Sequence, residues 1–300
     1  MKTALECMPC FLRQTLYAAR LSTSSIALQK EIMNSVSAIL PELDFNISPP
    51  HNSIRVYSEI AALSGCTDPF AALKKVSNDF AMVLSTEARK TIGQAEDPLF
   101  SAIVFSIAGN IIDYGSQQHF DADKAVKECL SKKLTINDYA LLKNDIEKAE
   151  SILYLGDNAG EIVFDGLVIE QLDKKVVFAV KEGPIINDAL REDAIACGLD
   201  TKCSVISNGT QCPGTPLDDC SEEFLDYFNS ADIIISKGQG NFETLSELNR
   251  PIYFLLTVKC PIVGNHITEL SGKEVKTGDM VLMKSSPQGL KENGKSSQTR

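Results

Sequence analysis

The 300-residue sequence has little histidine and no hydrophobic run long enough to cross a bilayer. Its three histidines, His51, His119 and His266, are too few to favour a His-rich zinc hydrolase or a Ser-His-Asp triad. The longest apolar stretch without a charge, residues 98–112, falls short of the roughly 20 residues that a membrane helix needs. We therefore expect no membrane span, and a chemistry that relies on carboxylates and a metal.

Positive charge is also scarce, with 29 Lys and Arg against 40 Asp and Glu and a net charge of -11. This balance repels phosphate backbones, so we expect no nucleic-acid partner. The first 20 residues lack the unbroken apolar core of a secretory signal, and nine cysteines are too dilute for a disulfide scaffold. We expect a cytoplasmic globular protein with reduced thiols.

The hydrophobic periodicity changes at about residue 148 and predicts an α/β fold in two parts. Residues 1–148 read as a helical domain, with helix starts before residue 52 and at Asp68, Asp97, Asp121 and Asn137. Residues 149–284 read as a Rossmann-like domain with a mostly parallel sheet and flanking helices. Its strands are expected at 152–155, 176–180, 204–206, 232–235, 252–256 and 280–283. The polar tail, residues 285–300, is expected to be loosely ordered.

Oxygen-bearing side chains follow two strands of the predicted sheet. Asp157 and Asn158 come directly after the first strand of that domain, and Asp188 follows the second. Ligands of an open parallel sheet bind at the carboxyl ends of its strands, so these side chains could share one divalent cation. Each is also a common helix cap, which is the alternative for each loop taken alone. We expect Asp157 on a solvent-facing loop, where Asp157→Ala would abolish turnover without unfolding the protein.

Two further strand ends carry residues suited to an anion. Gly238 and Gly240 free backbone amides that could contact a phosphate, although an ordinary tight turn uses the same glycines. Lys259 follows the strand at 252–256 and can supply a point charge to a phosphate oxygen, unless it is simply solvated.

Two pairs of polar or thiol side chains in the helical part each allow more than one role. Asn110 and Asp113 end the long apolar helix, where they either cap it or roof the crevice from the other domain. Cys7 and Cys10 form a Cys-x-x-Cys pair at the start of the first helix, where amide dipoles lower a thiol pKa. Burial, a redox role and half of a metal site are all open for this pair, and we favour burial.

Five ordered segments together resemble the metal-dependent damage-control phosphatase family, long catalogued as a domain of unknown function, in its stand-alone prokaryotic branch. The likeness spans nearly the whole chain. Its segments are residues 7–10, 108–113, 156–161, 183–188 and 237–241.

The resemblance implies a helical N-terminal domain packed on a Rossmann-like domain, in agreement with the periodicity. It implies that manganese, cobalt, nickel or magnesium is held by Asp157, Asn158 and Asp188, and that Lys259 meets the phosphate of the substrate. It further implies substrate contacts from the loops around the ion, at Glu161, Gln239, Gly240, Asn241 and Glu243.

The activity implied is hydrolysis of small phosphorylated metabolites, with sugar-phosphate-like monoesters as the usual class. Our working hypothesis is in-line attack by a metal-activated water, and covalent attack by Asp157 is the alternative. An S-adenosylmethionine-dependent methyltransferase and a non-catalytic, metal-dependent protein that binds a phosphometabolite are the competing functions. The sequence leaves open the physiological substrate, the native metal and the oligomeric state.

Overall fold

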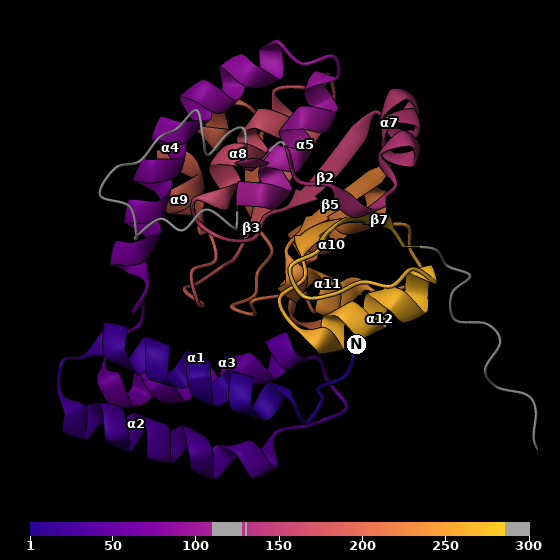
Figure 1. The fold of residues 1–300 in the computed structure, drawn as a ribbon. Helices are drawn as coiled ribbons and strands as arrows, with labels where there is room; N and C mark the ends of the chain where they lie inside the picture. Colours follow the sequence, from indigo (N-terminus) through magenta and orange to yellow (C-terminus); the bar gives the residue numbers. More distant parts are fainter. Residues whose placement is uncertain (110–127, 130, 286–300) are drawn as a thin grey trace, which may run out of the picture.

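A seven-stranded sheet forms the centre of the computed structural model, which describes residues 1–109, 128–129 and 131–285 (Figure 1). The strand order is β1-β7-β6-β5-β2-β3-β4, and every neighbouring pair runs parallel except β6 and β7. The predicted α/β class with a mostly parallel sheet is confirmed. The strands are β1 (Leu134–Asn137), β2 (Ser151–Leu155), β3 (Lys175–Val180), β4 (Ser204–Ser207), β5 (Ile233–Lys237), β6 (Tyr253–Thr257) and β7 (Met280–Lys284).

The first three helices form a bundle that lies apart from the sheet, and α4 runs from this bundle along the α/β body (Figure 1). The helices before the first strand whose bounds lie within the described residues are α1 (Cys7–Ser22), α2 (Ile26–Ile39), α3 (Pro49–Ser64), α4 (Ala71–Gly93) and α5 (Pro98–Ala108). The later helices are α7 (Tyr139–Lys148), α8 (Glu161–Ile169), α9 (Arg191–Ala196), α10 (Glu222–Ser230), α11 (Gln239–Leu245) and α12 (Pro261–Ser271). Within the described residues, no helix has the length and apolar character that a bilayer crossing requires.

Local sequence explains where two of these helices begin. The Ser48 side chain accepts a hydrogen bond from the backbone of His51, and prolines fill the first turn of α3, where no amide donor is needed. Asp97 does the same for α5, since its Oδ1 accepts from the Phe100 amide at 3.1 Å. α5 therefore begins at the predicted Asp97 cap, whereas α3 begins at Pro49, three residues before the start expected near residue 52.

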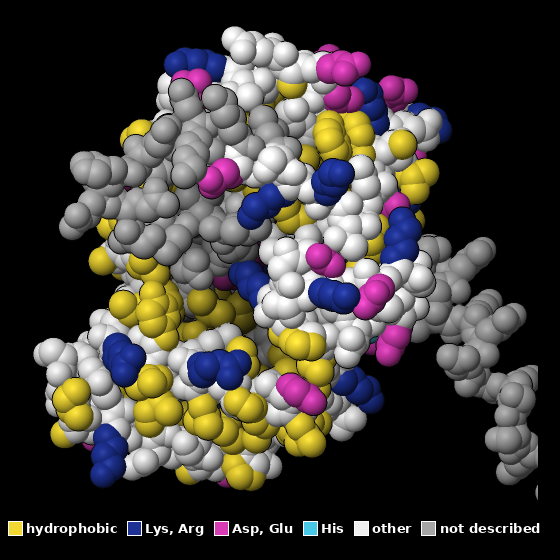
Figure 2. All heavy atoms as spheres, viewed as in Figure 1, with side chains coloured by type: hydrophobic (Ala, Val, Ile, Leu, Met, Phe, Trp, Pro, Cys, Tyr) yellow, Lys and Arg dark blue, Asp and Glu magenta, His cyan; other side chains and the backbone are white. Residues whose placement is uncertain are grey.

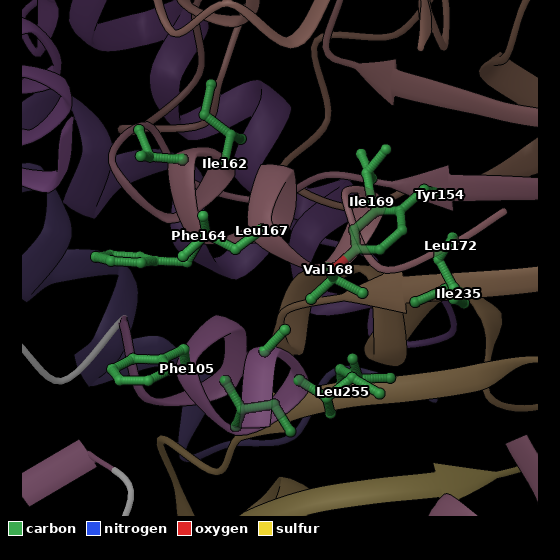
Figure 3. Packing of buried hydrophobic residues seen from close by; sticks show 14 of the residues in the cluster. Phe105, Tyr154, Ile162, Phe164, Leu167, Val168, Ile169, Leu172, Ile235 and Leu255 are labelled. Atoms are coloured by element: carbon green, nitrogen blue, oxygen red, sulfur yellow. The ribbon is translucent and has the colours of Figure 1, made fainter. Parts of the chain in front are cut away.

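The sheet separates two hydrophobic cores because successive strand residues face opposite sides. Tyr154 and Phe178 pack in a cluster with α4, α5 and α8, whereas Leu153 packs with α10, α11 and α12 on the other face. Figure 3 shows the first of these cores, where Phe105 of α5 and Phe164 of α8 lie close to the sheet residues. A third cluster joins α1, α2 and α3.

The first half of the chain contributes a strand that the sequence did not predict. β1 lies before the expected boundary and pairs parallel with β7, so the sheet begins at Leu134. Asn137, expected as a helix cap, is the last residue of this strand, and its Oδ1 accepts from the Tyr139 amide at 3.1 Å. A four-residue edge strand is too short to show a clear alternation of apolar and polar residues. The boundary at residue 148 stays a prediction, and Asp121 and the tail from residue 286 lie outside the described residues.

The strand order sets the position of the crevice. Chain progression runs outward through β2, β3 and β4 on one side, then returns to β5 and β6 on the other, so the direction reverses between β2 and β5. In open α/β sheets, ligands bind at this point, beyond the carboxyl ends of the strands. The loops after β2, β3, β5 and β6 therefore meet at the edge of the sheet where a ligand crevice is expected.

Candidate functional site

The loops after β2 and β3 form one backbone-paired unit. The Ala189 amide donates to the Asp157 carbonyl at 2.9 Å, and Asn158 and Asp188 form an antiparallel bridge. The three predicted metal ligands, Asp157, Asn158 and Asp188, therefore come together at the switch point from two neighbouring strands.

Asp157 does not lie on a solvent-facing loop, which corrects the expectation from sequence. Its side chain is only 6% exposed, because the loop after β5 packs directly against it. A Cβ atom at Gly238 would lie 2.1 Å from Asp157 Oδ2, and Gly238 has a φ of +81° that residues with side chains rarely adopt. The glycine is therefore required for the close approach of this loop to the carboxylate.

The Asn158 amide group is fixed between two carboxylates. Its Nδ2 donates to Asp157 Oδ2 at 2.8 Å and to Glu161 Oε1 at 2.6 Å. Both donor hydrogens are used, so the orientation of the amide is set and its oxygen is left as an acceptor. Asn158 thus presents a neutral oxygen next to two carboxylates.

The site concentrates buried negative charge. Burial, followed by the charges of neighbouring carboxylates, raises the pKa of Asp188 to about 8 and that of Glu161 to about 7. Burial also raises the pKa of Asp157, although Lys259 and Lys181 act against it. Desolvation disfavours the charged form of each acid, and the clustered negative charges repel one another. A cation among these groups would stabilise their charged forms.

The donor set fits a hard divalent cation. Asp188 Oδ2 is buried beside Asp157 and Asn158 and accepts no hydrogen bond from any described residue, although the charge of Lys181 Nζ lies 3.8 Å away. Carboxylate and amide oxygens suit magnesium or manganese better than zinc. No cluster of three or more His, Cys, Asp and Glu side chains arranged for a metal occurs in the described part of the chain, so a site here has two carboxylates and one amide.

The side-chain amide of Asn241 holds neighbouring loops together and has no hydrogen-bonding capacity left for a substrate. It is fully buried, and its Nδ2 donates to the carbonyls of Gly156 and Lys237. Its Oδ1 accepts from Lys181 Nζ at 3.1 Å and from Thr215 Oγ1 at 2.7 Å. Asn241 therefore connects the loops after β2, β3 and β4 with the end of β5, which differs from the substrate contact that the resemblance implies.

Two buried lysines stand beside the carboxylates. Lys181 Nζ is 3.8 Å from Asp188 Oδ2, and Lys237 Nζ is 3.8 Å from Glu161 Oε2. Lys237 also donates to Asp165 Oδ1 at 2.7 Å and to the Ser106 carbonyl at 3.0 Å. Burial acts to lower the pKa of Lys237, but Asp165 and Glu161 raise it overall, so this lysine is charged at neutral pH.

Helix α4 holds both metal-site loops from the other side. Asn78 Oδ1 accepts from the Gly160 amide at 2.6 Å, and Asn78 Nδ2 donates to Asp193 Oδ1 at 2.9 Å. Asp193 Oδ2 in turn accepts from the Leu190 amide at 3.0 Å. One buried polar chain therefore links the loop of Asp157 to the loop of Asp188.

The predicted phosphate side of the crevice is more open. Lys259 is exposed, and its backbone amide donates to Gln239 Oε1 at 2.8 Å. Gln239 Nε2 donates to Glu243 Oε1 at 2.9 Å, and burial raises the pKa of Glu243 to about 7. Gly240 packs against the Pro213 carbonyl, where a Cβ would lie 1.8 Å away. The loops after β5 and β6 are thus linked at the rim.

Asn110 and Asp113 lie outside the described residues. The Cys7 and Cys10 thiols are free, as are the other seven cysteines. The pKa of Cys7 is raised, chiefly by burial, which is opposite to the lowering expected from its place at a helix start. Both thiols are half-buried, and Cys7 packs against the α1–α3 core, which supports the burial that we favour from sequence.

Sequence reasoning missed the residues that hold the ligands in place. Lys181 and Lys237 each come directly at the end of a buried apolar strand, a signal that could have identified them. Asn78 and Asp193 gave no such signal, because they sit within helices or helix starts far from the motif loops. Their role follows from tertiary contacts alone.

The fold defines an α/β protein with a mostly parallel sheet, in which buried carboxylates gather at the switch point. Residues 3–275 match the family model described as "Damage-control phosphatase ARMT1-like domain". The chain therefore belongs to this damage-control phosphatase family, and membership assigns it to the phosphatases.

Several archaeal proteins are similar to the chain over nearly their whole length. A damage-control phosphatase of Pyrococcus horikoshii is 36% identical, covering 95% of this chain and 98% of its own. A damage-control phosphatase of Archaeoglobus fulgidus is 32% identical, covering 94% and 98%. The crystal structure of a DUF89 family protein from Pyrococcus horikoshii matches with a TM-score of 0.86 at 35% identity, covering 95% of this chain and all of that one.

Proposed function

We propose that this protein is a metal-dependent phosphatase that hydrolyses small phosphorylated metabolites, with sugar-phosphate-like monoesters as the substrate class. The observation that carries this proposal is the buried Asp188 Oδ2, which has no described hydrogen-bond partner and lies beside Asp157 and Asn158. A buried carboxylate oxygen without a hydrogen bond is costly, and Lys181 Nζ at 3.8 Å is too far away to donate one, so a bound cation or a proton would satisfy it. The match to the damage-control phosphatase family supports the reaction class.

Asp157, Asn158 and Asp188 are the residues that would hold the ion, which we propose to be manganese, cobalt, nickel or magnesium. When bound, such an ion supplies Lewis-acid polarisation of a phosphoryl oxygen and lowers the pKa of a coordinated water. The oxygen-only donor set supports this group of hard and borderline ions.

The remaining residues have separable tasks in this proposal. Lys259, exposed at the rim, neutralises charge on the phosphate from the open side of the crevice. Glu161, with a pKa of about 7, can hold or release a proton at neutral pH. Lys181 and Asn241 keep the loops in register, so that the ligands do not need to rearrange when substrate binds.

The decisive experiment is hydrolysis of p-nitrophenyl phosphate by protein stripped with EDTA and then supplied with manganese. We expect activity that disappears with the chelator and returns with the metal. Asp157→Ala should lower kcat/KM by more than the roughly 10 to 100-fold that loss of an outer hydrogen-bonding partner costs. Asp226→Ala, at an exposed position on α10, is the matched control and should keep full activity.

Two outcomes would contradict the proposal. Activity that survives exhaustive chelation would remove the metal from the reaction, and near-normal turnover by Asp157→Ala would remove Asp157 from the site. Circular dichroism of each variant checks that the fold is intact, because Asp157 is buried and its loss is not a surface change.

A further inference from the structure

A cavity of about 180 Å³ lies between α3, the turn into α4 and the loop after β3. We call it the α3 pocket; its walls include Tyr57, Ala61 and Phe70 on one side and Ile185 on the other. Figure 1 shows the loops that follow the central strands reaching towards the α1–α3 bundle, and Figure 2 shows hydrophobic side chains gathered beside the notch between that bundle and the α/β body. A cavity of about 150 Å³ can hold a benzene ring, so this space admits a six-membered ring.

The walls of the α3 pocket carry no free charge that would attract a phosphate. No Lys, Arg or His is among its lining residues. Its one carboxylate, Asp68, is engaged by Lys74 Nζ at 2.9 Å. The pocket is therefore suited to an uncharged group, whereas Lys181, 3.8 Å from Asp188 Oδ2, and Lys259 are not among its described lining residues.

One wall of the pocket leads directly to the metal site. The Ile185 carbonyl accepts a hydrogen bond from the Asp188 amide at 3.1 Å, so a pocket residue and a proposed ligand share one turn. Ile186, between them, has a φ of +45°, a region that β-branched residues rarely adopt. Such strain persists only where surrounding contacts hold it, which fixes this wall relative to Asp188.

Tyr57 places a polar group, its hydroxyl, in the wall of the α3 pocket. The residue is only 9% exposed, and its hydroxyl has no hydrogen-bond partner among the described residues. Burial raises the pKa of Tyr57, and the charge of Asp188 raises it further, so the phenol is neutral at neutral pH. A neutral phenol at this point can donate to, or accept from, a polar group on a ligand.

We propose that the α3 pocket binds the uncharged, ring-bearing organic half of the phosphomonoester, and that Tyr57 hydrogen-bonds to a polar substituent on that ring. The inference rests on the proposed function, because it assigns the phosphate to the crevice beside Asp157 and Asp188. The proposed function does not say how the protein distinguishes one phosphate ester from another. In this inference, the α1–α3 bundle and the loop after β3 make that distinction by binding the organic group.

Binding of non-hydrolysable probes tests the pocket without any need for turnover. Calorimetry in the presence of manganese measures the Kd of phenylphosphonate and of inorganic phosphate. Ala61→Phe fills the pocket, and Ala62→Phe, its exposed neighbour on α3, is the matched control. We expect Ala61→Phe to weaken phenylphosphonate at least about tenfold while inorganic phosphate changes by less than about twofold, because steric exclusion affects only the ring. Ala62→Phe should change neither.

A second variant tests the hydrogen bond from Tyr57. The probes are phenylphosphonate and its 3-hydroxy and 4-hydroxy derivatives, which differ only in a ring hydroxyl. Tyr57→Phe should weaken at least one hydroxylated probe by about 3 to 10-fold and leave phenylphosphonate unchanged. Tyr17→Phe, exposed on α1, is the control.

These results separate the inference from the proposed function. Equal losses for phenylphosphonate and phosphate in Ala61→Phe, or no loss for either, would overturn the pocket assignment even if the wild-type protein is an active phosphatase. Identical binding of all probes by Tyr57→Phe would overturn the role of Tyr57. Conversely, selective loss of the ring probe by a protein without turnover would support the pocket and contradict the phosphatase.

Discussion

Metal affinity should depend steeply on pH, because the proposed ligands lose their charge when buried. Asp188, whose pKa is raised to about 8, would be ionised in about 1% of molecules at pH 6 and in about half at pH 8. A cation binds the ionised form, so its apparent Kd should fall by about 50-fold between these two pH values from Asp188 alone. Asp157, also raised, acts in the same direction.

The same shift predicts how the metal-free protein responds to pH. An acid whose pKa is higher in the folded state favours folding while it is protonated, and that contribution is lost as pH rises from its ordinary pKa towards the folded one. For Asp188 this window runs from the ordinary value of 3.8 to about 8. The metal-free protein should therefore become less stable between pH 6 and 8, while the stabilisation gained from added cation should grow.

Titration calorimetry with EDTA-treated protein measures the first effect, and differential scanning calorimetry without metal measures the second. Asp188→Asn removes the titrating group, so the variant should bind weakly and with little change in Kd between pH 6 and 8. Asp226→Asn, on the exposed face of α10, should behave as wild type. Equal affinity at the two pH values, or tighter binding at pH 6, would refute the placement of Asp188 as a ligand.

Three further variants test the groups that hold the site together. Asn78→Ala should weaken the Kd for manganese about 10 to 100-fold, measured by calorimetry, with no change if α4 does not position the loops. Gly238→Ala should abolish metal-dependent hydrolysis, since its Cβ would meet Asp157 Oδ2; normal kcat/KM would contradict this contact. Lys237→Met should lower the free energy of unfolding in urea by about 3 to 5 kcal/mol because Asp165 stays buried and unpaired, and a cost below about 1 kcal/mol would show that the pair is not coupled.

The sequence predicts the sheet and the ligand loops well because both depend on local patterns. Apolar runs bounded by glycine and polar residues identify the six strands from β2 to β7 to within two residues, and the loops after β2 and β3 carry the oxygen ligands. β1 escapes prediction because a short edge strand has little pattern of its own. The register of the strands, by contrast, depends on pairing between segments that are distant in the sequence. A local sequence pattern therefore does not predict it.

The environment of the ligands is what a single sequence does not reveal. Asp157 follows a strand, where loops are usually solvated, but the close approach of Gly238 buries it. Asn241 lies in the first turn of a helix after a glycine turn, as a phosphate-binding residue would, yet hydrogen bonds to three loops and the end of β5 occupy its amide group. Both differences involve contacts between segments far apart in the sequence, such as Asp157 with Gly238 and Gly156 with Asn241.

The helical segment before the sheet is part of the site and not an appendage to it. Asn78 of α4 fixes the Gly160 amide, and the Ser106 carbonyl of α5 accepts from Lys237, the lysine beside Glu161. Without these two contacts, the loop of Asp157 would lose its anchor on one side and a buried charge would lose an acceptor on the other. A sheet with the ligand motif alone would therefore contain the correct donor atoms without the restraints that hold them together. The match to the family model, from residue 3 to residue 275, likewise includes the helical segment together with strands β1 to β6.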